Sequence, residues 1–310
     1  MRKYSMLHDL LGNSLYICGQ KENYMKWYSK YLEVYNKPFT DEQDAICNDV
    51  KDRISKIQSE NPVVTVSVIA YNEEKHLLAC LWALSNTICK YPLEIIGVNN
   101  DSKDRTAEIF ERCGVRYFNE YQHSCGFARL CGLNNTRGKY HINIDADTMY
   151  PPHYVETMVD ALSKEGVVGA SSLWSYIPDE KHPAWGVRLF EMMRDIHIWI
   201  QHFRRPELSV RGLVFAYNSE LGRKLGIRTD IIRGEDGYLA FQLKNHGKIV
   251  FVRKRRARAV TGYGTMDGDG TFWQSFWFRI KKYTMSIGRI FFSKKEYKDE
   301  DSNMVKKNRK

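Results

Sequence analysis

Residues 63–70, Val-Val-Thr-Val-Ser-Val-Ile-Ala, form a β-branched and almost continuously apolar run. A strand of this composition is typically buried on both faces, as in a parallel sheet covered by helices. Further strand-like runs alternate with helical patterns along the chain: strands at 93–98 and 139–144, helices near 77–84, 105–112 and 154–162. Such alternation indicates βαβ units. The sequence therefore predicts an α/β fold with a mostly parallel, Rossmann-like sheet flanked by helices.

Residues 1–61 precede this pattern and are predicted to form a helical extension. Aromatic residues recur there at helical spacing between Tyr24 and Tyr35, which is typical of packing residues. A second helix is predicted from Asp41 to about Ser59, and Thr40 with Gln43 resembles a capping box at its start.

The α/β pattern extends over residues 62–262, with a later helix at 185–205, another at 238–244 and a strand at 249–252. Residues 263–310 form a basic and aromatic tail. In this tail Ile280, Ile287 and Phe291 recur at helical spacing among lysines and arginines. The pattern is compatible with an interfacial helix that contacts a membrane surface, and equally with a helix packed on the preceding domain.

Lys and Arg outnumber Asp and Glu by 47 to 37, which gives a formal net charge of +10. A basic protein favours anionic partners such as nucleotides, phosphorylated lipids or a membrane surface. The seven cysteines form no C-x-x-C pair, which argues against a disulfide framework or a zinc site and favours a reducing compartment. No apolar stretch approaches the ~20 residues that cross a bilayer, and no secretory signal is recognised. We expect a cytoplasmic protein, soluble or peripheral at the inner face of the membrane.

Asp145-Ala146-Asp147 follows the strand-like run at 139–144. Side chains two residues apart on a strand share a face, so both carboxylates are expected on one side, with Ala146 pointing inside. Paired carboxylates are suitable ligands for Mg²⁺ or Mn²⁺, which commonly also bind the phosphates of a nucleotide. The alternative is that one aspartate caps the turn before Pro151 and the other is only solvated.

Four segments at strand ends fall in one order: Val66 to Glu74, Val98 to Thr106, Asp145-Ala146-Asp147, and Gly234-Glu235-Asp236. This series resembles the family 2 inverting glycosyltransferases, which transfer sugars from nucleotide diphosphates and have the GT-A fold. The resemblance covers roughly residues 62–262, and the order of the four motifs makes it specific.

The resemblance implies a donor-binding set and a metal pair. Its donor residues are Ala70, Asn72, Glu73, Asn99, Asn100, Arg129, Asp145 and Ala146. Asp145 and Asp147 are the implied ligands of Mn²⁺ or Mg²⁺. At the positions of Asn99 and Asn100 the family often has Asp, so the choice of nucleotide base stays open, with a UDP-sugar favoured and a GDP-sugar as alternative. Asp104 is expected instead to cap the helix that follows it.

The resemblance also implies that Asp236 is the general base for the acceptor hydroxyl, with Glu235 as the fallback. The alternative role of Asp236 is the N-cap of a helix at 237–245. Gly212 would allow close approach of backbone to the acceptor sugar. Trp273 and Trp277 could stack on that sugar, and core packing explains them equally well.

Two departures from the family pattern refine the expectation. Residues 259–261, Ala-Val-Thr, stand where many relatives have a metal-binding His, and the Q-x-x-R-W motif of processive members is absent. The expected activity is therefore non-processive transfer of a single sugar to a glycan or lipid-linked acceptor, as in cell-surface polysaccharide assembly. The alternatives are a catalytically inactive relative and a polyanion-binding protein. Nucleic acid is not expected as a partner, because unpaired acids at strand ends would repel it.

Overall fold

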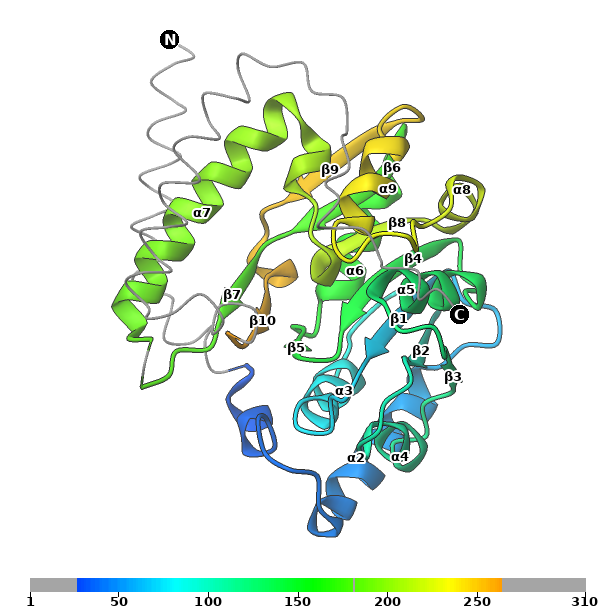
Figure 1. Ribbon diagram of the computed structural model, residues 1–310, viewed down its shortest axis with the longest axis vertical. Helices are drawn as coiled ribbons and strands as arrows, with labels where there is room; N and C mark the ends of the chain where they lie inside the picture. Colours follow the sequence, from blue (N-terminus) through cyan, green and yellow to red (C-terminus); the bar gives the residue numbers. More distant parts are fainter. Residues whose placement is uncertain (1–26, 181, 264–310) are drawn as a thin grey trace, which may run out of the picture.

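The computed structural model describes residues 27–180 and 182–263. At its centre lies a seven-stranded sheet with the strand order β3-β2-β1-β4-β8-β6-β9 (Figure 1). The strands are β1 Val64–Ala70, β2 Leu93–Asn99, β3 Tyr117–Asn119, β4 Tyr140–Asp145, β6 Val167–Ser172, β8 Phe215–Asn218 and β9 Lys248–Val252. β1 pairs in parallel with both β2 and β4, so the carboxyl ends of these three strands lie side by side.

The predicted α/β fold with a mostly parallel sheet is confirmed, and β8 is the exception. β8 pairs antiparallel with β4 and with β6, whereas β6 and β9 are parallel. The sequence pattern does not predict β3, β6 or β8. β3 and β8 are short, and β6 ends in Gly-Ala-Ser-Ser, whose small residues give no strand signal of their own.

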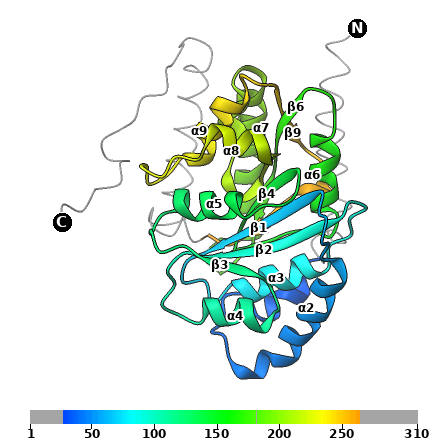
Figure 2. The same cartoon turned by 90° about the vertical axis from the view of Figure 1, so that its right-hand side faces the viewer.

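Helices cover both faces of the sheet (Figure 2). α3 Leu77–Ser85 and α4 Thr106–Arg112 lie on one face, and α5 Cys125–Asn134 lies on the other. α6 Tyr154–Leu162 completes the helices predicted at the start of the α/β region. α5 was not predicted by periodicity; it begins at Ser124, whose hydroxyl accepts a hydrogen bond from the backbone of Phe127.

The amino-terminal extension packs below α3 and α4. α2 Asp44–Ile57 follows the 3₁₀ helix η2 Asp41–Gln43, and the predicted capping box between Thr40 and Gln43 is present. The aromatic segment before it is only a short 3₁₀ helix, η1 Ser29–Glu33, within the described residues. Tyr28 and Tyr31 are nevertheless buried, as expected for packing residues.

The carboxy-terminal half carries the remaining helices, which are α7 Ala184–Arg204, η3 Pro206–Ser209, η4 Gly212–Val214, α8 Ser219–Leu225, α9 Glu235–Leu243 and η5 Arg255–Ala257. α7 agrees with the predicted helix at 185–205. α9 begins at Glu235 rather than at Tyr238, because Gly234 adopts a left-handed conformation with φ 101° and serves as its N-cap.

A second, three-stranded sheet lies beside the end of β4. It contains β5 Thr148–Met149, β10 Ala259–Thr261 and β7 Trp174–Tyr176, in the order β5-β10-β7. β10 pairs antiparallel with β5 and parallel with β7. The turn that joins β4 to β5, which contains Asp147, is therefore fastened to the last strand that the structure describes.

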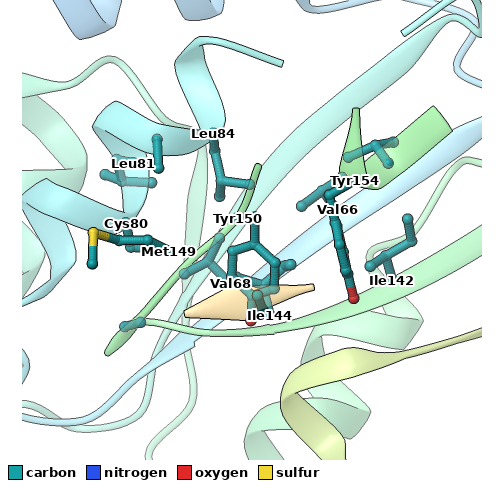
Figure 3. Packing of buried hydrophobic residues seen from close by; sticks show 14 of the residues in the cluster. Val66, Val68, Cys80, Leu81, Leu84, Ile142, Ile144, Met149, Tyr150 and Tyr154 are labelled. Atoms are coloured by element: carbon teal, nitrogen blue, oxygen red, sulfur yellow. The ribbon is translucent and has the colours of Figure 1, made fainter. Parts of the chain in front are cut away.

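One face of the main sheet packs into the large hydrophobic core. Figure 3 shows Val66 and Val68 of β1 and Ile142 and Ile144 of β4 beside Leu84 of α3. Met149, Tyr150 and Tyr154 close this core from the segment that follows β4 (Figure 3). Residues 145–148, which we call the Asp-Ala-Asp turn, thus continue from a strand with one face packed against the core.

Within the described residues, no helix combines the length and the apolar character needed to span a membrane. The predicted tail lies outside the described residues except for Tyr263. The boundaries at 61/62 and 262/263 stay predictions.

Candidate functional site

β4 presents two different faces, because its side chains alternate. Ile142 and Ile144 point into the core, whereas His141, Asn143 and Asp145 point to the side of α5 and α9. His141 and Asn143 are 0% and 1% exposed, so this polar face is buried and not solvated. Buried polar groups need hydrogen-bond partners, and the partners define the site.

Asp145 and Asp147 lie at the end of β4, as the sequence predicts, and Ala146 between them is buried. β4 ends at Asp145, however, so the expected strand alternation does not extend to Asp147. The Asp145 carboxylate accepts a hydrogen bond from Arg129 Nη2 at 2.7 Å. The Asp147 carboxylate accepts one from Thr148 Oγ1 at 2.8 Å. Asp145 is therefore paired with a basic side chain and Asp147 with a neutral hydroxyl, and the two carboxylates repel each other.

Asp147 has an unfavourable environment for a negative charge. Burial, with the charges of Asp145 and Glu73, raises the pKa of Asp147 to about 7. A divalent cation between these carboxylates would relieve that repulsion. In residues 27–180 and 182–263 no three His, Cys, Asp or Glu side chains are arranged to hold a metal ion. Two carboxylates completed by substrate phosphates and water are a common environment for Mg²⁺, so the residues present fit such an ion.

Arg129 of α5 joins Asp145 of the Asp-Ala-Asp turn to the second acidic motif, Glu235-Asp236. Its Nη2 lies 2.7 Å from Asp145 Oδ1, and its Nε lies 3.1 Å from Asp236 Oδ2 and 3.4 Å from Glu235 Oε1. The side chain is 4% exposed. Burial opposes the charge of Arg129, but the three carboxylates outweigh it and raise the pKa of Arg129 well above its ordinary value. One arginine thus binds three carboxylates, those of Asp145, Glu235 and Asp236.

Asp236 does not cap its helix. Gly234 is the N-cap of α9, and Asp236 lies within the first turn, 8% exposed. Its Oδ1 accepts a hydrogen bond from Asn143 Nδ2 at 2.7 Å. Burial raises the pKa of the Asp236 carboxyl well above its ordinary range; Glu235 and Asp145 add to this, whereas Arg129 opposes it. A carboxylate with a raised pKa is better suited to accept a proton near neutral pH.

Gly212 lies directly against this cluster. A Cβ atom at Gly212 would lie 2.2 Å from Asp236 Oδ2 and 2.2 Å from Arg129 Nη2. Both distances are shorter than the contacts that Cβ atoms make in folded proteins, so a side chain at this position would require Asp236 and Arg129 to shift. The segment predicted to contact the acceptor is therefore adjacent to the predicted base, as the sequence implies.

The loops after β1 and β2 are bonded to each other. Asn72 has a positive φ of 52°, its backbone N–H donates to Ser102 Oγ, and its side-chain oxygen accepts from the backbone of Lys103 at 2.7 Å. The backbone N–H of Glu73 donates to Thr106 Oγ1 at 2.8 Å. Asn72 and Glu73 thus lie where the predicted nucleotide-binding turn should be, at the carboxyl ends of the parallel strands.

Asp104 has the structural role that the sequence favours. Its Oδ1 accepts from the backbone N–H of Thr106, the first residue of α4, at 3.0 Å. Its Oδ2 accepts from the backbone N–H of Glu74 at 3.0 Å. The N-cap residue of α4 is Arg105, so Asp104 lies one position before the predicted capping position, but its carboxylate still binds the first N–H of the helix. The same carboxylate also holds the loop after β1.

Asn99 and Asn100, predicted to bind the donor, are buried and make internal contacts. Asn99 Nδ2 donates to Asn119 Oδ1 at 2.8 Å. Asn100 Nδ2 donates to the carbonyl groups of Glu120 and Gln122. Both amides therefore hold the segment after β3 against the end of β2, and their contribution to base recognition stays a prediction.

Two features of the site were missed by sequence reasoning. The first is the pair His141 and Asn143, for which the sequence does contain a signal: they alternate with Ile142 and Ile144 in a run that is predicted to be a strand. Tyr35 gives no local signal: its hydroxyl donates to the carbonyl of Asp147 at 2.8 Å, from a residue far away in the sequence. Thr261 contacts the same carbonyl at 3.4 Å. Residues 259–261 thus support the Asp-Ala-Asp turn through its backbone. Trp273 and Trp277 lie outside the described residues.

Comparison with known proteins agrees with this arrangement. Residues 65–220, just over half of the 310-residue chain, match Glycosyl transferase family 2. Over 107 residues the chain is 32% identical to the uncharacterized glycosyltransferase RP339 of Rickettsia prowazekii, which covers 34% of this chain and 33% of that protein. Over 124 residues it is 30% identical to glycosyltransferase AglE of Haloferax volcanii, covering 37% of this chain and 41% of AglE. The matched segments thus span well under half of these relatives.

Solved structures show the same fold at low sequence identity. The mannosyltransferase PcManGT of Pyrobaculum calidifontis, in complex with GDP-Man and Mn²⁺, superposes with a TM-score of 0.51 at 19% identity, over 70% of this chain and 68% of that chain. TarS of S. aureus in complex with UDP gives 0.50 at 14% identity, over 64% and 60%. The architecture is that of the GT-A glycosyltransferases. With its matched sequence, its fold and its strand-end acids in the expected order, the chain belongs to glycosyl transferase family 2.

Proposed function

We propose that this glycosyltransferase is metal-dependent and inverting, and that it transfers a single sugar from a nucleotide diphosphate to a glycan or lipid-linked acceptor. The observation that carries the proposal is the position of Arg129. This buried arginine forms ion pairs both with Asp145 of the Asp-Ala-Asp turn and with Asp236, the proposed base. A donor-side acid and a candidate base therefore lie within one cluster, as transfer between two bound substrates requires.

The donor would lie at the carboxyl ends of β1, β2 and β4. We assign Ala70, Asn72 and Glu73 to the nucleotide, with Asn99 and Asn100 behind them, and Asp145 and Asp147 to a Mn²⁺ or Mg²⁺ ion. Such an ion would neutralise charge on the leaving nucleoside diphosphate. Arg129 Nη1 is buried and has no hydrogen-bond partner among the described residues. It is the kind of donor that a phosphate oxygen satisfies.

In the proposed reaction Asp236 accepts the proton of the acceptor hydroxyl, with Glu235 as fallback. The hydroxyl oxygen forms a new bond to the anomeric carbon from the face opposite the leaving group. The bond from that carbon to the diphosphate oxygen breaks, and the nucleoside diphosphate leaves with the electron pair. Configuration is inverted because one displacement occurs.

Other proteins of this fold support the donor class. PcManGT was solved with GDP-Man and Mn²⁺, and TarS with UDP. We favour a UDP-sugar as donor, with a GDP-sugar as the alternative, and a role in cell-surface polysaccharide assembly. We further propose residues 62–262 as the catalytic unit and the tail as the segment that could contact a membrane.

The first experiment is thermal unfolding with UDP, GDP, CDP or dTDP, each with Mn²⁺ and again with EDTA. A nucleotide at ~100 times its dissociation constant should stabilise the protein by roughly 2.7 kcal/mol, a clear shift in melting temperature. Stabilisation by one nucleotide only with Mn²⁺ supports the metal site and identifies the base. No shift with any nucleotide contradicts the donor assignment and favours an inactive relative.

Two variants separate binding from transfer. Asp147→Ala should abolish the metal-dependent stabilisation, because it removes a cation ligand. Asp236→Asn should keep that stabilisation and lose sugar transfer, because an amide does not accept the proton. Sugar transfer by Asp236→Asn at the wild-type rate would refute the assignment of the base.

A further inference from the structure

A line of hydrogen bonds runs through the buried polar face of β4 and ends on Asp236. Thr136 Oγ1 lies 2.7 Å from His141 Nδ1, and His141 Nε2 lies 2.9 Å from Asn143 Oδ1. Asn143 Nδ2 lies 2.7 Å from Asp236 Oδ1. His141 and Asn143 are almost completely buried, so no water competes for these partners. We call these four residues the β4 hydrogen-bond chain.

The β4 hydrogen-bond chain has one direction. The amide of Asn143 turns its nitrogen to Asp236, so its oxygen must accept from His141. His141 Nε2 therefore carries a proton. In a neutral imidazole Nδ1 is then an acceptor. The single hydroxyl hydrogen of Thr136 has two acceptors within reach, His141 Nδ1 at 2.7 Å and the carbonyl of Gly132 at 2.9 Å, and a neutral His141 uses the first. The hydrogens on His141 Nε2 and Asn143 Nδ2 both point toward Asp236, which must accept at Oδ1.

His141 remains neutral in this environment. Burial, together with the charges of Arg129 and Arg223, lowers the pKa of His141 to about 3, although the hydrogen bond to Asn143 acts in the opposite direction. The chain consequently delivers hydrogen-bond donors to Asp236 without bringing another charge. This separates its effect from that of Arg129, which acts through its charge on Oδ2.

We infer that Asn143 and His141 are positioning residues for the proposed base: they fix Asp236 Oδ1, favour the ionised carboxylate, and leave Oδ2 beside Gly212 for the acceptor hydroxyl. The inference rests on the proposed function, because it presupposes that Asp236 is the base. A donor hydrogen bond to the charged form of a carboxyl favours that form. The β4 hydrogen-bond chain thus opposes the effect of burial, which favours the protonated form of Asp236.

Several charged or titratable groups face Asp236 besides the chain. Arg129 approaches from α5, Glu235 from α9 itself and Asp145 from β4. Tyr217 of β8 also interacts electrostatically with Asp236, and the centroid of its ring lies 5.1 Å from that of the His141 ring. Replacement of Asn143 by Leu leaves all four groups in place. The change in Asp236 that follows is therefore attributable to the lost hydrogen bond.

The test is the titration of the Asp236 carboxyl, followed by ¹³C NMR of the full chain with labelled Asp and identified by its absence in Asp236→Asn. Asn143→Leu should raise the titration midpoint by about 1 to 2 pH units, the effect of one hydrogen bond to a charged group. His141→Leu should raise it by a smaller amount, because Asn143 loses its anchor. His141→Gln should restore the wild-type midpoint, because its amide N–H can replace Nε2–H. Ile142→Val, on the opposite face of the same strand, is the packing control and should not move it.

An unchanged midpoint in Asn143→Leu would overturn the inference. A second measurement uses only the wild-type chain: ¹⁵N NMR of its imidazoles, with His141 assigned through His141→Gln. A proton on Nε2 and none on Nδ1 between pH 5 and 8 is expected, and the opposite tautomer or a charged ring contradicts the direction of the chain.

The proposed function can fail separately. Release of UDP from UDP-N-acetylglucosamine and of GDP from GDP-mannose, with Mn²⁺, is compared in the wild type and Asp236→Asn. If the wild type releases nucleotide and Asp236→Asn does so equally, the base assignment and the inference both fail. If Asp236→Asn is inactive and Asn143→Leu retains the wild-type titration midpoint, only the inference fails.

Discussion

Replacement of Arg129 by Met tests whether one buried cation holds the acidic cluster together. Arg129 lies within 3.4 Å of Asp145, Glu235 and Asp236 and is 4% exposed. Methionine fills a similar volume without charge, so the three carboxylates lose the basic partner that they share within the described residues. The two on α9 are themselves about nine-tenths buried, with exposed side-chain fractions of 8% and 10%.

The cost can be estimated from this geometry. At an effective dielectric constant of about 20, each pair at roughly 3 Å attracts by about 5 kcal/mol before desolvation is counted. Removal of one partner of a buried ion pair typically costs about 3–5 kcal/mol, because the remaining charge is buried without compensation. We expect Arg129→Met to lower the free energy of unfolding by about 3–5 kcal/mol at pH 8.

The loss should depend on pH in a defined direction. Without Arg129 the folded-state pKa values of these carboxyls rise, so protonation relieves their repulsion as the pH falls. The difference from wild type should therefore be smaller at pH 5.5 than at pH 8, measured by urea unfolding. Arg53→Met is the control, because Arg53 forms an exposed ion pair with Asp49 and should cost under about 1 kcal/mol at either pH. A loss below about 1 kcal/mol in Arg129→Met, or a loss independent of pH, would refute the reasoning.

Three more predictions concern Gly212, His141 and Tyr35. Gly212→Ala should lower the free energy of urea unfolding by about 1–3 kcal/mol and reduce sugar transfer, since its Cβ would lie 2.2 Å from Asp236 Oδ2. Gly237→Ala is the control, because a Cβ at Gly237 has nothing within 4 Å. Equal losses of stability in the two variants would contradict the close approach at Gly212. His141 has a folded-state pKa of about 3, below its unfolded value, so its contribution is present above pH 6.5 and is lost on acidification. The wild type should thus lose about 2 kcal/mol between pH 7 and 5 that His141→Gln does not lose; parallel stability curves would show that His141 is not buried in the neutral form. Tyr35→Phe should cost about 1 kcal/mol and weaken Mn²⁺-dependent nucleotide stabilisation, since it removes the hydrogen bond to the Asp147 carbonyl; unchanged stabilisation would show that the turn holds its shape unaided.

The core of the fold was predictable because its signals are local. β1 and β2 are rich in β-branched and other apolar residues, and the helix that follows β1 has regular apolar spacing. β6 and β8 were not predictable in this way, since their strand conformation depends on pairing with each other and with distant β4 and β9. Tertiary context decides such short segments.

The sequence predicts residues of the candidate site, but not the hydrogen bonds that connect them. The order of the acidic motifs placed Asp145, Asp147 and Asp236 at strand and helix ends. Nothing local in the sequence shows that Asn143 bonds to Asp236, because the two residues are 93 positions apart. Periodicity also does not predict the left-handed conformation of Gly234. Because Gly234 is the N-cap, α9 begins at Glu235, and the alternative role of Asp236 as N-cap is wrong.

The long-range contacts of the Asp-Ala-Asp turn affect when, during synthesis, the protein can become functional. The carbonyl of Asp147 is contacted by Tyr35, 112 positions before it, and by Thr261, 114 positions after it. Contacts over such separations close long loops and are expected late in folding. During synthesis, β1, β2 and β4 can pair before residue 261 leaves the ribosome, whereas β10 cannot yet support β5. Catalytic competence would then follow the emergence of β10 and not the assembly of the main sheet, so a nascent chain could be largely folded and still unable to consume its sugar donor.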